Sequence, residues 1–139
     1  DGGVGTITVD WSASNAARTF KMSDASILEW EVGSSANDLI DLSGVADGQT
    51  ETLDLDDFIL KISEAGGSPT AADQLPVFTY DADVTVDMAG FDNDANNFDT
   101  TALVGAWITT GLSLEDDLAG TIYLTGLSAP VKGTIVTIR

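Results

Sequence analysis

The sequence predicts an all-β fold, namely a single antiparallel β-sandwich or jelly-roll-like domain of roughly eight or nine strands. Apolar and polar residues alternate with a period of two in many short segments, which is typical of half-buried strands. Clusters of glycine, aspartate, asparagine and serine separate these segments, as turns do. A length of 139 residues suits one domain, so we expect residues 1–139 to share one hydrophobic core.

The first predicted strand covers residues 6–11, where Ile7, Val9 and Trp11 lie on one face. It follows a glycine-rich segment, so we expect it to be tethered on one side only. A strand tethered in this way pairs within its own domain or adds to the sheet edge of a neighbour. Residues 1–11 are therefore a candidate for exchange between neighbouring subunits.

Two further strands are predicted over residues 18–22 and 26–32, and a short apolar segment over residues 39–42 comes before the next turn. Residues 26–32 alternate apolar and acidic side chains, which favours a strand. A helix is the second interpretation of that segment, because glutamate and leucine favour helices and Asp24 would cap one.

Residues 52–62 are predicted to form two strand halves with a change of phase between them. Leu53 belongs to one parity and Phe58 to the other, so a β-bulge or a tight corner at Asp56 and Asp57 is needed to keep one face buried. The polar stretch that follows, up to residue 74, is predicted to be a surface loop.

Residues 80–88 alternate without interruption and predict one continuous strand. Residues 90–101 then gather carboxylates and carboxamides between two apolar segments. If the chain has a chemical site, we expect it in this loop.

The last third of the chain is predicted to contain a buried strand or helical turn over residues 103–109, a loop over 111–118, and strands over 120–126 and 131–139. The triplet Gly-Thr-Ile recurs at the start of three strands, but no fixed period accompanies it. We therefore expect no solenoid. In residues 131–139, apolar side chains occupy both faces, with Ile135 on one and Val136 and Ile138 on the other. We expect either the rim of a second sheet or another molecule to cover one of these faces.

Composition narrows the classes of function. The chain has no cysteine and no histidine, which removes the common nucleophile and general-base arrangements, and we expect no enzymatic activity. The formal net charge of −18 opposes binding to nucleic acid, and no segment is apolar enough for membrane insertion. The sequence begins at Asp1 without methionine, which suits either a processed, secreted chain or a domain excised from a larger protein.

The predicted polar loop contains a candidate calcium site formed by Asp92, Asp94, Asn96 and Asp99. Oxygen ligands that alternate along a curling loop converge on a hard cation such as Ca²⁺. The loop is not an EF-hand, because Leu103 stands where that motif has its glutamate. The alternative is that these residues only form turns.

A second, weaker calcium candidate lies at the predicted corner, where Asp54, Asp56 and Asp57 gather. Calcium is thus the one cofactor that the sequence suggests. The same acidic residues also suit a solvated surface in a salty medium.

These observations favour a structural subunit of an extracellular or cell-surface assembly, such as a filament, a surface layer or a virion shell. Its partner would be another copy of itself, bound by β-strand addition and stabilised by calcium. The predicted subunit interface consists of Ile7, Val9, Trp11, Ile135, Val136 and Ile138.

The alternative function is a calcium-containing carbohydrate-binding module or adhesin domain that binds glycans through exposed aromatic rings. The parities of Trp11, Trp30 and Trp107 predict core packing for all three. Tyr123 has the opposite parity to its apolar neighbours, so it is the aromatic residue expected to face outward.

Overall fold

The computed structural model describes residues 5–9, 17–33, 36–42, 50–65, 74–104 and 107–129. Within these ranges the protein is all-β, as predicted, with one short 3-10 helix, η1 (Ala95–Asn97). Its strands are β1 (Thr6–Thr8), β2 (Thr19–Met22), β3 (Ile27–Val32), β4 (Leu39–Leu42), β5 (Glu51–Leu55), β6 (Ile59–Glu64), β7 (Gln74–Tyr80), β8 (Val84–Asp87), β9 (Phe98–Ala102), β10 (Ser113–Asp116) and β11 (Thr121–Thr125).

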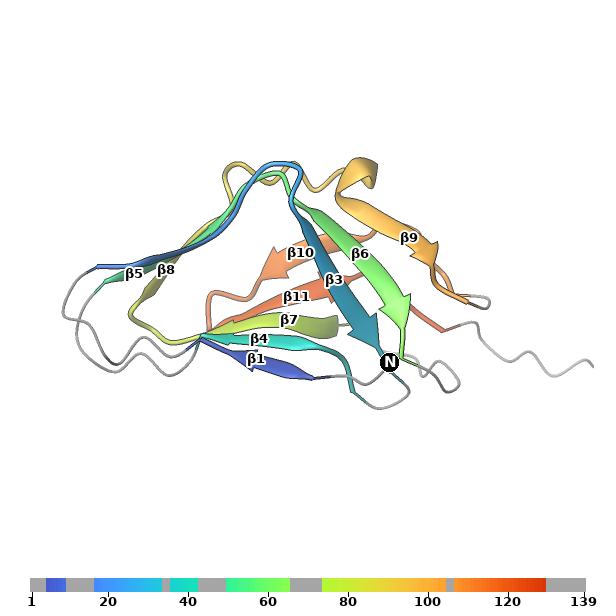
Figure 1. Cartoon of the computed structure of the whole chain (residues 1–139), viewed down its shortest axis with the longest axis horizontal. Coiled ribbons are helices and arrows are strands. Elements are labelled where there is room, and N and C mark those ends of the chain that lie inside the picture. The colour runs from blue at the N-terminus through green and yellow to red at the C-terminus, as the bar shows by residue number, and fades with distance from the viewer. Residues whose placement is uncertain are drawn as a thin grey trace, which may run out of the picture.

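The strands form three sheets that make the sides of a triangle in projection (Figure 1). Sheet A has the order β1-β4-β7-β11-β10, sheet B the order β2-β5-β8 and sheet C the order β3-β6-β9. The chain visits the sheets in rotation, through β2, β3 and β4, then β5, β6 and β7, and then β8 and β9. It therefore winds as a coil whose successive turns stack on one another.

The predicted antiparallel sandwich is wrong, because every pair of strands in sheets B and C is parallel. In sheet A, β1, β4 and β7 are also parallel, and only β11 pairs antiparallel with β7 and β10. Alternation of apolar and polar residues reports one buried face, which coil strands and sandwich strands share. It does not report strand direction, so the sequence pattern was compatible with both.

The expectation of no solenoid is also wrong, since the coil has a structural period. Contacts between successive turns join residues 33 apart in Gly5–Asp38 and Lys21–Asp54, and 32 apart in Glu29–Lys61. In sheet A the separation widens to 38 for Asp41–Thr79. Identical residues need not repeat in such a coil, because each turn only has to present an apolar side chain inward at the same level.

The core fills the inside of the triangle. Residues that are level on neighbouring parallel strands point the same way, so Leu53 and Leu55 of sheet B and Leu60 and Ile62 of sheet C all face the axis and are fully buried. Trp30 is also buried, at 1% exposure, and its indole N–H donates to the carbonyl oxygen of Asp38 at 2.7 Å. Burial of this tryptophan confirms the prediction for it.

The predicted change of phase after Leu55 corresponds to a corner of the triangle. β5 ends there, β6 starts at Ile59 on the next sheet, and Phe58 is buried between them. The amide of Phe58 donates to the carbonyl oxygen of Asp56 at 2.8 Å, which tightens the bend. Of the two alternatives, the corner is therefore correct. Residues 26–32 form a strand rather than a helix, as the alternation favoured.

The strand predicted over residues 80–88 is in fact two strands on different sheets. β7 ends at Tyr80, and a turn closed by the amide of Val84 and the carbonyl oxygen of Asp81, at 3.0 Å, leads into β8. Tyr80 is the last residue of β7 and Val84 is the first residue of β8, and both side chains pack in or against the core. The alternation of apolar and polar residues therefore continues through this corner. Period alone therefore misses the change of sheet.

Two further predictions need correction near the end of the chain. Residues 113–116, predicted as loop, form β10. Residues 98–102 form β9, although residues 98–101 were predicted as the end of the polar loop. Both strands are short and polar, and only Leu114 and Phe98 are buried in them. Residues 131–139, predicted as the last strand, lie outside the described residues.

Candidate functional site

The first candidate site is the β1 edge, by which we mean residues 5–9 and the groove beside them. β1 pairs in parallel with β4, with Thr6 level with Leu39. The amide of Leu39 donates to the carbonyl oxygen of Gly5 at 3.0 Å, and the amide of Val9 donates to the carbonyl oxygen of Asp41 at 2.9 Å. β1 is the end strand of sheet A, so its other side has no strand beside it in the described structure.

Burial of β1 is slight. All three of its residues are exposed, and the side chain of Ile7 is 63% exposed. Val9, just beyond the strand, is partly buried against the core. A groove of about 160 Å³ lies between β1, β3 and β4, and the apolar residues Ile7, Leu28, Trp30, Leu39 and Ile40 contribute to its lining.

Two of the predicted interface residues, Ile7 and Val9, thus lie together at this edge. Trp11, Ile135, Val136 and Ile138 lie outside the described residues.

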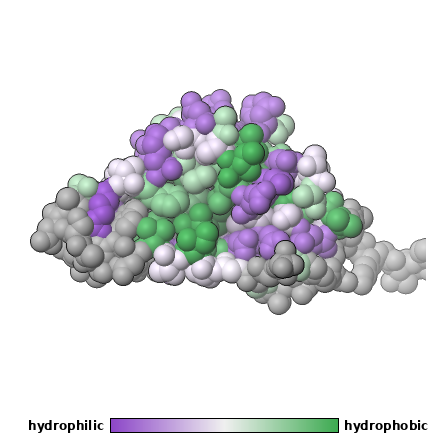
Figure 2. All heavy atoms as spheres, in the orientation of Figure 1, coloured by the Kyte–Doolittle hydropathy of each residue, from purple (hydrophilic) through white to green (hydrophobic). Residues whose placement is uncertain are grey.

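The end of the coil at which β1, β2 and β3 lie is apolar in its middle. Figure 2 shows hydrophobic residues in the middle of the viewed face and hydrophilic residues along its upper rim. Phe20 and Met22 of β2 and Leu28 of β3 pack against the core from this first turn but are only partly buried. Since β2 and β3 are end strands of their sheets, no further turn covers these side chains in the described part of the chain.

The second candidate site is the polar loop that precedes β9. Asp94 caps η1: its Oδ1 accepts the amide of Asn96 at 2.7 Å, and its Oδ2 accepts the Asn96 side-chain Nδ2 at 3.0 Å. The amide of Asp94 in turn donates to Oδ1 of Asn97 at 2.9 Å, which completes a capping box.

Two asparagines in this loop hold it to the rest of the protein. Asn93 has a left-handed backbone with φ of 56°, and its side chain exchanges two hydrogen bonds with the backbone of Leu114, at 3.0 and 2.8 Å. Asn97 is only 2% exposed, and its Nδ2 donates to Oδ1 of Asp57 at 2.6 Å and to the carbonyl oxygen of Phe58 at 3.0 Å. Sequence reasoning missed both roles, because only the fold brings their partners near.

The four predicted calcium ligands lie on three different elements. Asp92 is on the exposed loop, Asp94 and Asn96 contact each other at the cap, and Asp99 is already in β9. One oxygen of Asp99 accepts the hydroxyl of Thr101 at 2.6 Å and its amide at 2.9 Å. Both hydrogen bonds lower the pKa of Asp99, and the bond from the hydroxyl of Thr101 has the larger effect. In the described residues no three acidic side chains are grouped to hold a metal ion.

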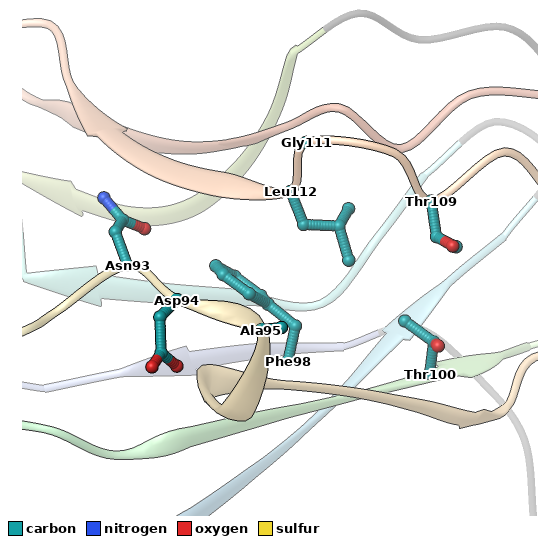
Figure 3. Close-up of a pocket in the computed structure, with 8 residues that line it drawn as sticks. All are labelled: Asn93, Asp94, Ala95, Phe98, Thr100, Thr109, Gly111 and Leu112. Carbon is teal, nitrogen blue, oxygen red and sulfur yellow. The ribbon is translucent and has the colours of Figure 1, made fainter.

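A shallow cavity of about 380 Å³ opens beside this loop (Figure 3). Asn93 and Asp94 border it on one side, and Thr109, Gly111 and Leu112 border it on the other. The side chains of Phe98 and Leu112 point toward one another, whereas the carboxylate of Asp94 points away from them (Figure 3). The cavity therefore has an apolar surface in its middle, and the carboxylate of Asp94 does not point into it.

The second predicted calcium cluster is arranged around a lysine. Lys21 Nζ lies 2.7 Å from Oδ2 of Asp54 and 2.6 Å from Oδ2 of Asp56, and the hydrogen bond to Asp54 is the main reason why the pKa of Lys21 is raised. Asp57 points elsewhere and accepts Asn97. In this cluster the positive charge comes from the protein itself.

Two other acidic groups have unusual surroundings. Glu51, at the start of β5, is fully buried, and neither of its carboxylate oxygens has a hydrogen-bond partner. The hydroxyl of Tyr80, at the end of β7, donates to Oδ1 of Asp116 in β10 at 2.5 Å, and β11 lies between these two strands of sheet A. Burial, followed by this hydrogen bond, raises the pKa of Tyr80.

The chain matches no family model, no curated protein and no solved structure. Among the described residues, no helix has the length and apolar character needed to cross a membrane.

Proposed function

We propose that the protein is a structural subunit of an extracellular assembly, such as a filament, and that copies of it join by β-strand addition. The observation that carries this proposal is the exposed strand β1 at the end of sheet A. Its backbone groups on the outer side are unpaired by any described strand, and such an edge is a template for another chain.

The energetics of β1 support an intermolecular role. Full burial of an isoleucine side chain is worth about 1.5–3 kcal/mol. Ile7 keeps 63% of its area exposed, so the isolated chain gains only part of that stabilisation. Burial of Ile7 therefore holds β1 only weakly on its own fold, and the strand is available to another copy.

Calcium stabilisation is part of the proposal. The chain carries a formal net charge of −18, so subunits repel each other unless cations screen or bridge them. The carboxylates of Asp92, Asp94 and Asp99 are the groups we propose to attract the ion, with a carboxamide oxygen from Asn96. No catalytic role belongs to this proposal.

Electron microscopy of the purified protein, with and without millimolar calcium, tests the proposal. We expect ordered fibres or sheets that loosen in chelator. Deletion of residues 1–11 should leave a folded domain that does not assemble, whereas continued assembly of that variant would contradict strand addition by this segment.

A point variant distinguishes strand addition from nonspecific association. Ile7→Asp should abolish assembly, because it places a charge on the contact face. Leu118→Asp is the matched control, since Leu118 is 87% exposed and lies in the turn between β10 and β11, away from the β1 edge. Equal loss of assembly in both variants would favour nonspecific association.

Glycan binding is the second candidate function. Tyr123 is half-buried on the outer side of β11, level with Glu115 and Pro76 on the two neighbouring strands. An aromatic ring flanked by a carboxylate is able to stack on a sugar and to accept its hydroxyl groups. Binding to a glycan array that is lost in Tyr123→Ala would favour this function.

A further inference from the structure

Several strands of the described structure have a free edge, so the strand that receives β1 in an assembly needs to be identified. We propose that it is β4 of the adjoining copy. β1 would leave its own β4 and pair, in the same parallel register, with β4 of the next subunit. This inference rests on the proposed function and specifies its acceptor.

β4 is already complementary to β1. Thr6, Ile7 and Thr8 are level with Leu39, Ile40 and Asp41.

Asp38, just before β4, fixes the start of this register. Its Oδ1 accepts the amide of Gly5 at 2.6 Å, and its Oδ2 accepts the amide of Glu31 at 2.9 Å. An identical segment from a second copy would find the same donors and acceptors, so the exchange requires no new complementarity.

β1 is also the strand that separates most easily from the described fold. Its three residues are all exposed, whereas β3 carries Trp30 and β5 carries Leu53 into the core. Segments with few buried apolar contacts open at low cost, without global unfolding. Opening of β1 frees the edge of β4 and the donor strand at the same time.

Chain length limits where the neighbour lies. Residues 10–16 connect Val9 to Ala17, and at about 3.3–3.6 Å per residue this connection spans roughly 25–30 Å at most. The acceptor β4 must therefore lie close to the first turn of the donor. The partly buried Phe20, Met22 and Leu28 are at this end, so a second copy held by exchange would also cover them.

Cysteine pairs test the exchange directly, because the natural chain has no cysteine. Thr6 and Leu39 are level on parallel strands about 4.8 Å apart, a separation that a disulfide accepts. Assemblies grown from an equal mixture of Thr6→Cys and Leu39→Cys chains should give, after oxidation, a covalent dimer on a non-reducing gel. Assemblies grown from either variant alone are the control and should give no dimer, because no cysteine on β1 of one copy then meets a cysteine on β4 of another.

The doubly substituted chain provides the reverse test. Thr6→Cys with Leu39→Cys, oxidised as a monomer, ties β1 to its own β4 and should block assembly until reductant is added. Thr19→Cys with Thr52→Cys is the matched control, since it ties the level residues of β2 and β5 and should assemble like the natural chain.

The outcomes separate the inference from the proposed function. Assembly without the Thr6–Leu39 cross-link, and unaffected by the lock, would overturn β4 as acceptor while strand addition at another edge stays open. A cross-linked but discrete dimer would support β4 as acceptor and contradict a filament. Failure of the natural chain to assemble under any condition would overturn both.

Discussion

Single residues decide how firmly the polar loop is held. Asn97 is the clearest case, because its buried amide connects η1 to Asp57 and Phe58 at the corner between β5 and β6. An asparagine in a polar loop reads as a turn former from sequence alone. Here the fold turns it into an interior hydrogen-bond donor.

Replacing Asn97 should therefore destabilise the protein. Asn97→Asp removes both donated hydrogen bonds and places a second carboxylate beside Asp57, and we expect a loss of about 2–4 kcal/mol in the free energy of unfolding. Asn96→Asp is the control, because Asn96 is exposed and should cost less than about 1 kcal/mol. Chemical denaturation followed by tryptophan fluorescence measures both, and equal losses would contradict the role of Asn97.

Glu51 gives a prediction of the opposite sign. Its carboxylate is fully buried and without a hydrogen-bond partner, which is costly for any polar group. Glu51→Leu should raise the free energy of unfolding at neutral pH by about 1–3 kcal/mol. Glu115→Leu, at an exposed position of β10, should change it little. Destabilisation by Glu51→Leu in denaturant titrations would show that the carboxylate has a partner in solution.

At the scale of elements, side-chain hydrogen bonds join pairs of strands, and one of these bonds involves a group whose titration affects stability. The Tyr80–Asp116 bond joins β7 to β10, and the pKa of Tyr80 is raised by burial and by the neighbouring carboxylate. A group whose folded-state pKa exceeds its unfolded value adds stability that is complete below the unfolded value and is lost progressively as pH rises from that value through the folded-state pKa.

The stability of the protein should consequently fall as pH rises above about 10, the ordinary pKa of tyrosine. Tyr80→Phe should lack this part of the decline, whereas Tyr123→Phe should keep it. Thermal unfolding between pH 8 and 11 measures the effect. Parallel decline in natural chain and Tyr80→Phe would show that another group is responsible.

Lys21 connects β2 with β5 by pairing with two aspartates. Lys21→Met leaves Asp54 and Asp56 facing each other without a cation, so the melting temperature should drop more at low salt than at 1 M salt. The freed carboxylates should also bind calcium, so calcium should raise the melting temperature of this variant more than that of the natural chain. No added response to calcium would argue against a cation site at this cluster.

Elements were predictable where one face is buried and the segment stays on one sheet. Residues 18–22, 26–32 and 120–126 were recognised as strands for this reason, whereas residues 39–42, which form β4, were recognised only as a short apolar segment. Corners were harder, because alternation continues through the turn at 81–83.

At the candidate sites, the sequence placed Ile7 and Val9 in one strand, and the structure has Ile7 in β1 with Val9 just beyond its end. The sequence also placed Asp94 near Asn96, and these two side chains are in contact. The sequence did not reveal that Lys21 occupies the second acidic cluster, since the two partners are separated by a full turn of 33 residues.

The whole molecule is a coil in which nearly all strand pairing is distant in sequence. Strand direction and sheet membership depend on which turns stack, and no local pattern encodes that. The antiparallel hairpin of β10 and β11 is the exception, with Thr125 bonding to the carbonyl oxygen of Ser113, 12 residues away.

The difference in sequence separation between the hairpin and the parallel strand pairs affects the order in which they fold. The hairpin closes a short loop and loses little chain entropy, whereas each parallel pair must close a loop of a full turn. We expect the hairpin to form first, to dock on β7, and to template the winding of the coil back toward the first turn. On that route β1 joins last, so each newly wound subunit presents a vacant β4 edge for a time. Whether its own β1 or that of a neighbour arrives first then depends on protein concentration, and the speed of winding sets the concentration at which copies begin to join.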